Sequence, residues 1–182
     1  KWISRVAGLR YGYEEAIGYC VDPGQVRDKD GVTAALLLAE MAAGLRAQGR
    51  SLLDVLDDLA LAHGVHATDS FAVRVDDQEV IGTVMSHLRL KPPTHIGGVP
   101  VIRIDDLSEG SQHLPPTDGL RYHLEDESRV IVRPSGTEPK LKVYLEAIVP
   151  VAPSSGLSAA KAEARGRLDR VRASMEGLTR AP

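Results

Sequence analysis

Hydrophobic residues follow two different patterns along the chain, and the pattern changes near residue 67. In the first part, residues 30–48 (DGVTAALLLAEMAAGLRAQ) are rich in Ala and Leu, which predicts a helix. Apolar positions nearly surround this helix, so we expect it to be buried on most sides. Asp28 or Asp30 fits its N-terminal cap, and Gly49 fits its C-terminal cap.

A second helix is predicted at residues 52–62, directly after Ser51, which fits an N-cap with Asp54 three residues on. Its apolar side chains fall on one face, and they are Leu52, Leu53, Leu56, Leu59 and Ala60.

After residue 67 the pattern becomes one of mixed strands and helices. Apolar stretches of strand length predict four strands, at residues 70–75, 99–104, 129–132 and 141–149. Amphipathic stretches predict two helices, at residues 77–90 and 157–178.

These elements divide the chain into two expected parts. Residues 1–67 are expected to be an α/β fragment, an incomplete mixed-sheet α/β domain, because two helices and a short amino-terminal piece do not cover a parallel sheet. Its missing strands are expected upstream of Lys1. Residues 68–182 are expected to form a small α+β domain with an antiparallel sheet of about four strands and two helices.

The composition is that of an ordinary soluble globular protein, with 182 residues of which 43% are hydrophobic and 26% charged. A net charge of −3 argues against nucleic-acid or membrane-surface binding, so an anion site would have to be local. The single cysteine, Cys20, excludes an internal disulfide and fits a reducing cytoplasm. The chain has neither a membrane-length apolar run nor a signal peptide, and it begins without methionine, which suggests a fragment.

Between the last two predicted strands lies RPSGTEPK, a turn longer than a tight hairpin needs. Arg133 supplies a planar cation for two hydrogen bonds, and Lys140 adds a second positive charge. Ser135 and Thr137 supply hydroxyls, while Gly136 lets successive N–H groups turn toward an anion. This loop is therefore interpreted as a phosphate site. The alternative is a polar hairpin whose hydroxyls only satisfy the turn backbone.

Near the amino terminus, YGYEEAIGY places Glu14 and Glu15 between glycines and tyrosines. Carboxylates accept paired hydrogen bonds from neighbouring sugar hydroxyls, so the two acids could hold a sugar, although a solvated acidic turn has the same composition. In the following DKDGV, Lys29 could face a ligand phosphate, or its neighbours could simply cap the helix. The six histidines are scattered without metal-ligand spacing, so no metal site is expected here.

Taken in this order and at this spacing, YGYEEAIGY, DKDGV and RPSGTEPK resemble the carboxy-terminal half of an α-D-phosphohexomutase, the family of phosphoglucomutase and phosphomannomutase. The resemblance implies that Glu14 binds sugar hydroxyls and that Lys29 lies near the substrate. It implies that the phosphate that is not transferred is bound by Arg133, Ser135, Gly136 and Thr137.

Two departures concern the branch of the family. Ala16 stands where the family usually has a serine, and the sugar loop lacks the histidine of phosphoglucosamine mutases and bacterial phosphomannomutases. Together with EEAIGY, this points to the phosphoglucomutase/phosphopentomutase-like branch.

The resemblance also implies parts that this chain lacks. Family members transfer phosphate between the 1 and 6 positions of hexose phosphates through a bisphosphorylated sugar, which also activates the enzyme. A phosphoserine and a magnesium-binding Asp-rich loop, both in upstream domains of the same protein, carry out the transfer. The chain has neither, so we expect it to bind hexose or pentose phosphates weakly and to be inactive alone. The alternatives are a non-catalytic phosphosugar-binding module, a plain structural domain, or phosphopentomutase as the main activity of the whole enzyme.

Overall fold

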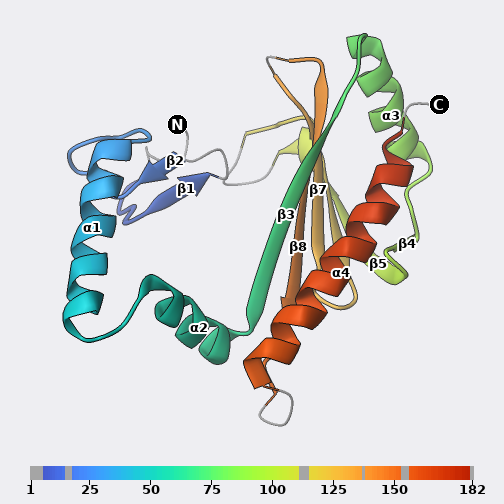
Figure 1. Ribbon diagram of the computed structural model, residues 1–182. Coiled ribbons are helices and arrows are strands. Elements are labelled where there is room, and N and C mark those ends of the chain that lie inside the picture. The colour runs from blue at the N-terminus through green and yellow to red at the C-terminus, as the bar shows by residue number, and fades with distance from the viewer. Residues whose placement is uncertain (1–5, 15–17, 111–114, 137, 153–155, 181–182) are drawn as a thin grey trace. The chain divides into compact units, whose positions relative to one another are not determined.

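A computed structural model of the chain describes residues 6–14, 18–110, 115–136, 138–152 and 156–180 (Figure 1). The chain divides into two compact units, Lys1–Asp57 and Asp58–Pro182. None of the described helices combines the length and the apolar character that a bilayer span requires.

The first unit contains a small hairpin and a long helix. Strands β1 (Gly12–Glu14) and β2 (Gly18–Cys20) pair antiparallel, with Glu14 opposite Gly18. Helix α1 (Gly31–Ala47) begins at the predicted N-cap Asp30, whose carboxylate accepts hydrogen bonds from two backbone N–H groups of the first turn. It ends in a left-handed turn at Gly49 (φ 70°), where the N–H groups of residues 49 and 50 bond back to the last-turn carbonyls.

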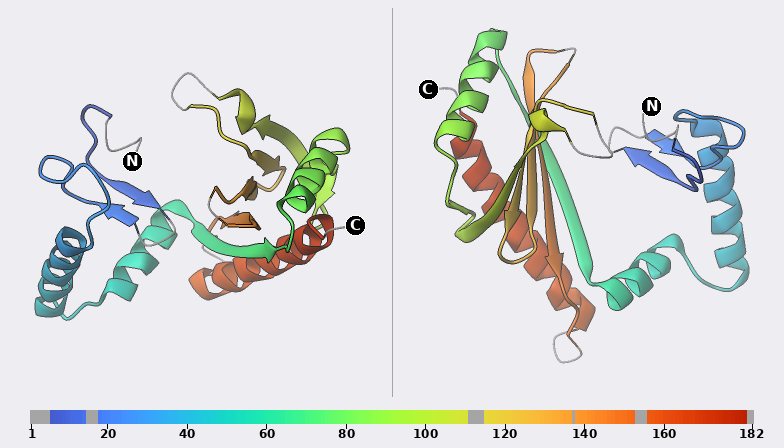
Figure 2. Two further views of the ribbon diagram at one scale, coloured as in Figure 1. Left: turned by 90° about the horizontal axis from the view of Figure 1, so that it is seen from above. Right: turned by 180° about the vertical axis from the view of Figure 1, so that it is seen from behind.

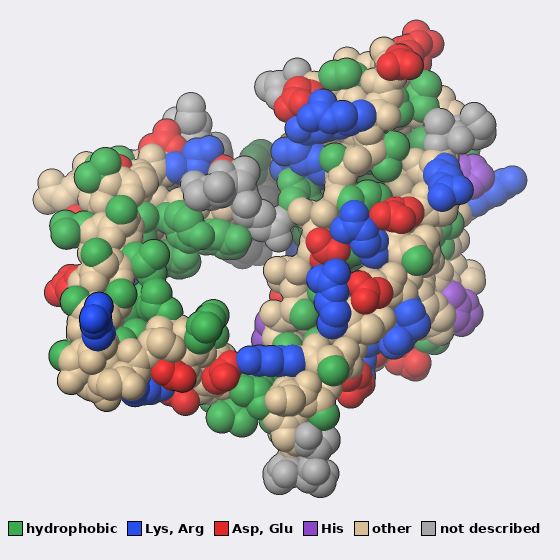
Figure 3. Space-filling model, viewed as in Figure 1, with side chains coloured by type: hydrophobic (Ala, Val, Ile, Leu, Met, Phe, Trp, Pro, Cys, Tyr) green, Lys and Arg blue, Asp and Glu red, His purple; other side chains and the backbone are tan. Residues whose placement is uncertain are grey.

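The expectation that α1 is buried on most sides is wrong. Leu45 is its only described residue that is buried, whereas Val32 is 79% exposed and Leu36 71% exposed. Figure 3 shows hydrophobic side chains at the surface of this unit. An apolar helix is buried only where other elements pack against it. In the described part of this unit, the only sheet is a two-stranded hairpin.

Helix α2 (Leu52–His63) begins as predicted at Leu52, directly after the cap residue Ser51. The Ser51 Oγ accepts a hydrogen bond from the Asp54 N–H, and the Asp54 carboxylate accepts one from the Ser51 N–H at 2.7 Å. The boundary between the units falls inside this helix. No described residue of α2 is buried, although Ala60 packs on a small apolar cluster that includes Val65.

The second unit is built on a six-stranded antiparallel sheet with the order β3-β8-β7-β6-β5-β4. The strands are β3 (Val65–Arg74), β4 (His95–Ile96), β5 (Val99–Asp106), β6 (Leu120–Leu124), β7 (Arg129–Pro134) and β8 (Lys140–Val149). About four strands were predicted, and the two that were missed are β4 and β6. Strand β4 has two residues, too few for a periodic signal, and β6 has five directly after a polar connection.

Helices α3 (Gln78–Leu90) and α4 (Gly156–Leu178) lie against one face of this curled sheet (Figures 1 and 2). Side chains alternate strictly along β8. Those facing the helices are buried, and they are Leu141, Val143, Leu145, Ala147 and Val149. They form one core with apolar residues of the neighbouring strands and of both helices. Within the described residues of the second unit, both helices pack on the same face of the sheet, and the side chains of β8 on the opposite face are partly exposed.

Candidate functional site

The predicted phosphate loop joins β7 to β8, the two strands that flank it in the sheet. The Ser135 N–H donates to the Lys140 carbonyl at 2.8 Å, and the Lys140 N–H donates to the Glu138 carbonyl at 2.8 Å, so the backbone closes on itself. Ser135 is buried, whereas Arg133 and Gly136 are exposed. Thr137 lies outside the described residues.

A second cation, which the sequence interpretation did not single out, stands beside Arg133. Lys142 on β8 is directly opposite Arg133 on β7 in the sheet register. Lys142 lies among the half-exposed residues of β8, so the two side chains share the face of the sheet that the helices leave open. Neither side chain makes a hydrogen bond or ion pair with another residue of the described ranges. Like charges directly opposite each other destabilise a strand pair, and a bound anion relieves that repulsion.

The third cation of the loop, Lys140, is already paired. Its Nζ donates to Glu138 Oε1 at 2.8 Å, and the other carboxylate oxygen accepts from Arg74 on β3 at 3.3 Å. The hydrogen bond and the positive charge of Lys140 lower the pKa of Glu138 below its ordinary value. The Lys140 side chain is 16% exposed and that of Glu138 is 44% exposed, so the ammonium is the less solvated group of this pair.

The predicted sugar-binding residues of the first unit come together as an ion pair. Lys29 Nζ lies 2.8 Å from Glu14 Oε1, and this hydrogen bond together with the carboxylate charge raises the pKa of Lys29. Gly18, opposite Glu14 in the hairpin, lies directly beneath both side chains, and a Cβ at this position would collide with each of them. Glu15 and Ala16 lie outside the described residues.

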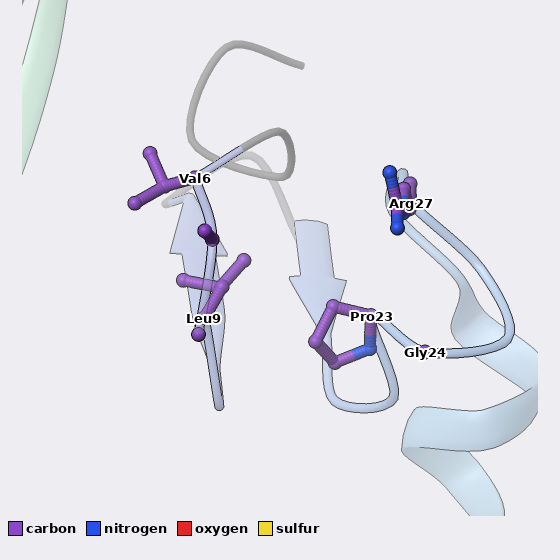
Figure 4. A pocket seen from close by; sticks show the side chains of 7 residues that line it. Val6, Leu9, Pro23, Gly24 and Arg27 are labelled. Atoms are coloured by element: carbon purple, nitrogen blue, oxygen red, sulfur yellow. The ribbon is translucent and has the colours of Figure 1, made fainter.

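The same unit contains an open hollow of about 290 Å³ (Figure 4). Its walls are mostly apolar or glycine, with one cation, and the lining residues are Val6, Ala7, Gly8, Leu9, Pro23, Gly24 and Arg27. None of the predicted site residues lines it.

An ion-pair cluster in the second unit is centred on Asp105 of β5. Asp105 is a partner of Arg121 and His123, both on the neighbouring strand β6. Burial opposes ionisation of Asp105, but the hydrogen bonds from His123 and Arg121 prevail and lower its pKa. Within the described ranges, no group of three or more His, Cys, Asp or Glu side chains could hold a metal ion.

Two sequence profiles of one protein family match the chain. The profile described as "Phosphoglucomutase/phosphomannomutase, alpha/beta/alpha domain III" matches residues 4–62, and the profile of the C-terminal domain of the same proteins matches residues 72–150. The chain belongs to this family. The resemblance to the carboxy-terminal half of an α-D-phosphohexomutase is thereby confirmed, whereas the predicted boundary at residue 67 and the predicted branch stay predictions.

Named relatives of this phosphohexomutase chain include a probable phosphomannomutase from Haemophilus influenzae, 43% identical over 148 residues, which are 81% of this chain and 30% of that protein. A phosphoglucomutase from Staphylococcus aureus is 34% identical over 149 residues, covering 74% of this chain and 27% of that protein. The chain therefore spans less than a third of the length of these curated relatives.

A solved structure also resembles this phosphohexomutase chain. It is the open form of pp63/parafusin, a phosphoglucomutase from Paramecium, with a TM-score of 0.56 and 18% identity over 91% of this chain and 31% of that one. At this identity the likeness shows the fold alone. The roles of the individual site residues therefore rest on the geometry described above.

Proposed function

We propose that this chain is the substrate-recognition part of an intramolecular phosphotransferase that moves phosphate between the 1 and 6 positions of glucose or mannose through a bisphosphorylated sugar. The observation that carries the proposal is the pairing of Arg133 with Lys142 on the open face of the sheet, with no carboxylate partner among the described residues for either. Two adjacent cations repel each other, and an anion bound between them would relieve this repulsion.

A phosphate group fits this arrangement better than a carboxylate does. Its three terminal oxygens can accept two parallel bonds from the Arg133 guanidinium and one from Lys142, with Lys140 as a further cation. Gly136 is exposed at the tip of the turn, where its backbone can approach a ligand. Ser135 and Thr137 are proposed as hydroxyl donors, and the five predicted phosphate ligands are thus joined by Lys142.

The sugar is proposed to bind at the ion pair of Glu14 and Lys29, and Glu15, the next residue in the sequence, is proposed as a further sugar ligand. The Glu14 carboxylate lies 2.8 Å from Lys29 Nζ, and a carboxylate can accept hydrogen bonds from two neighbouring hydroxyls at once. A site that holds either end of the sugar in turn must be built from groups that do not react, and Arg, Lys and Glu meet that requirement here.

The reacting groups are proposed to lie elsewhere in a longer protein. The metal and the phosphoserine are proposed to come from upstream domains of the same polypeptide. This agrees with the described ranges, in which no group of three or more His, Cys, Asp or Glu side chains could hold a metal ion. Those domains would also cover the exposed apolar faces of α1 and α2. The chain alone is expected to be inactive, and a cytoplasmic location with a sugar bisphosphate as activator stays part of the proposal.

Calorimetric titration of the chain with glucose 1-phosphate tests the phosphate site. We expect affinity in the millimolar range, about −4 kcal/mol, and a loss of at least about tenfold in Arg133→Ala and in Lys142→Ala. Arg170→Ala is the matched control, because Arg170 is an exposed arginine on α4, away from the open face of the sheet. Equal affinity of the parent and the Arg133→Ala variant would overturn the proposal.

A further inference from the structure

Glu138 is an unexpected residue in a loop proposed to bind phosphate. It lies two residues after Gly136, and its ionised carboxylate repels any anion that approaches the turn. The carboxylate also holds Lys140, whose side chain is only 16% exposed, through a 2.8 Å hydrogen bond. A simple phosphate site would gain affinity by omitting this residue, so its presence calls for a physical reason.

The reason lies in the empty site. Arg133, Lys140 and Lys142 are three cations on neighbouring positions of two paired strands, and without an anion they repel one another. Glu138 compensates one of these charges and holds the turn closed while no ligand is present. Its pKa is lowered by Lys140, so the carboxylate remains ionised throughout the neutral range.

Arg74 is a second cationic partner for the Glu138 carboxylate. It stands at the end of β3, directly opposite Lys140 in the sheet register, and already contacts Glu138 Oε2 at 3.3 Å. The Val75 N–H donates to the Pro139 carbonyl at 3.1 Å, which fixes the backbone of β3 beside the loop. The Arg74 side chain is 72% exposed, so its guanidinium has room to rotate and to bind both oxygens of the Glu138 carboxylate.

We propose that Glu138 acts as a built-in competitor of the phosphate: it holds Lys140 in the empty site and passes to Arg74 when a phosphate takes that ammonium. Arg74 is then a positioning residue that never touches the ligand. This inference rests on the proposed phosphate site and adds an exchange step to it. The step makes and breaks only ion pairs, so no bond or proton has to be accounted for.

The test is a double-mutant cycle with inorganic phosphate as the probe, measured by calorimetric titration of the chain at low salt. Glu138→Gln removes the competing charge and is expected to raise phosphate affinity about three- to tenfold. Arg74→Ala leaves Glu138 with Lys140 as its sole cation and is expected to lower affinity about two- to fivefold. In the Glu138→Gln background, Arg74→Ala is expected to have no effect.

Glu125→Gln is the matched control for charge, because Glu125 is exposed and follows β6, at the other end of β7 from the phosphate loop. It is expected to leave phosphate affinity unchanged. Thermal unfolding of each variant shows that the fold is intact before the titrations are compared.

Two results would overturn the inference. One is a loss of affinity in Glu138→Gln, which would make Glu138 a supporting residue of the bound state. The other is an equal effect of Arg74→Ala in both backgrounds, which would place Arg74 on the phosphate itself. Both results differ from failure of the proposed function. In that case Arg133→Ala leaves phosphate affinity unchanged, and so does every variant of the cycle.

Discussion

The ion pair between Arg89 and Asp106 makes the stability of the second unit depend on pH. Arg89, in the last turn of α3, donates from Nε to Asp106 Oδ2 at 2.8 Å at the end of β5, and its Nη2 lies 2.5 Å from Asp118 Oδ1. Side-chain exposure is 29% for Arg89 and 32% for Asp106, so solvent screens this contact only in part. The pair fastens a helix to the sheet that it covers.

The size of the effect follows from the pKa of Asp106. The hydrogen bond from Arg89 and a further one from the Ser108 N–H lower it from 3.8 to about 2. A shift of this size corresponds to about 2.4 kcal/mol of unfolding free energy at 1.36 kcal/mol per unit, and partial exposure reduces it to about 1–2 kcal/mol. Because the folded-state pKa is depressed, this stabilisation is complete above about pH 4 and is lost as the pH falls toward 2.

Urea denaturation of the chain and of Asp106→Asn at pH 7 measures the difference directly, and we expect the variant to be less stable by about 1–2 kcal/mol. Below about pH 2 the gap between the two proteins should close, because Asp106 is then protonated in the parent as well. Asp76→Asn is the control, since Asp76 is exposed and lies outside these contacts. A variant as stable as the parent at pH 7, or a gap that persists in acid, would refute the reasoning.

Two further outcomes test the core and the sugar site. Tyr122→Phe should leave unfolding free energy within about 1 kcal/mol of the parent or raise it, because the Tyr122 hydroxyl is buried without a hydrogen-bond partner in the described ranges; a larger loss in thermal unfolding would reveal a hidden partner. Gly18→Ala should lower affinity for glucose 1-phosphate about three- to tenfold, because a Cβ displaces Glu14 and Lys29, while affinity for inorganic phosphate stays unchanged. If Gly18→Ala bound glucose 1-phosphate as tightly as the parent does, the ion pair would have no role in sugar binding.

Local signals predicted the helices well. The cap residues Asp30 and Ser51 act through their own side chains on backbone groups two or three residues away, so spacing along the chain is sufficient to find them. Burial of α1 was not predictable in the same way, because it depends on which elements cover the helix. Strand β4 was missed because two residues carry no period, although its partner β5 holds it in the sheet.

In the candidate site too, the local features were predictable from the sequence, whereas the contacts between strands were not. Residue types alone single out Arg133, Ser135 and Lys140, since few loops combine cations, hydroxyls and glycine. The role proposed for Lys142 depends on the register between β7 and β8, and the role proposed for Arg74 depends on the register between β3 and β8. A pattern in one strand does not reveal which residue of another strand stands opposite it.

The position of β8 in the sheet bears on how this protein is made. Strand β8 lies between β3 and β7, so the first strand of the unit to be synthesised has a partner only after the last strand has been added. Pairing over such a long stretch of chain is slow, because the intervening loop must close before the contacts that reward it exist. On the ribosome, β3 therefore emerges as an unpaired strand and waits through the synthesis of α3 and four further strands. During that interval its exposed edge is open to chaperones and to aggregation.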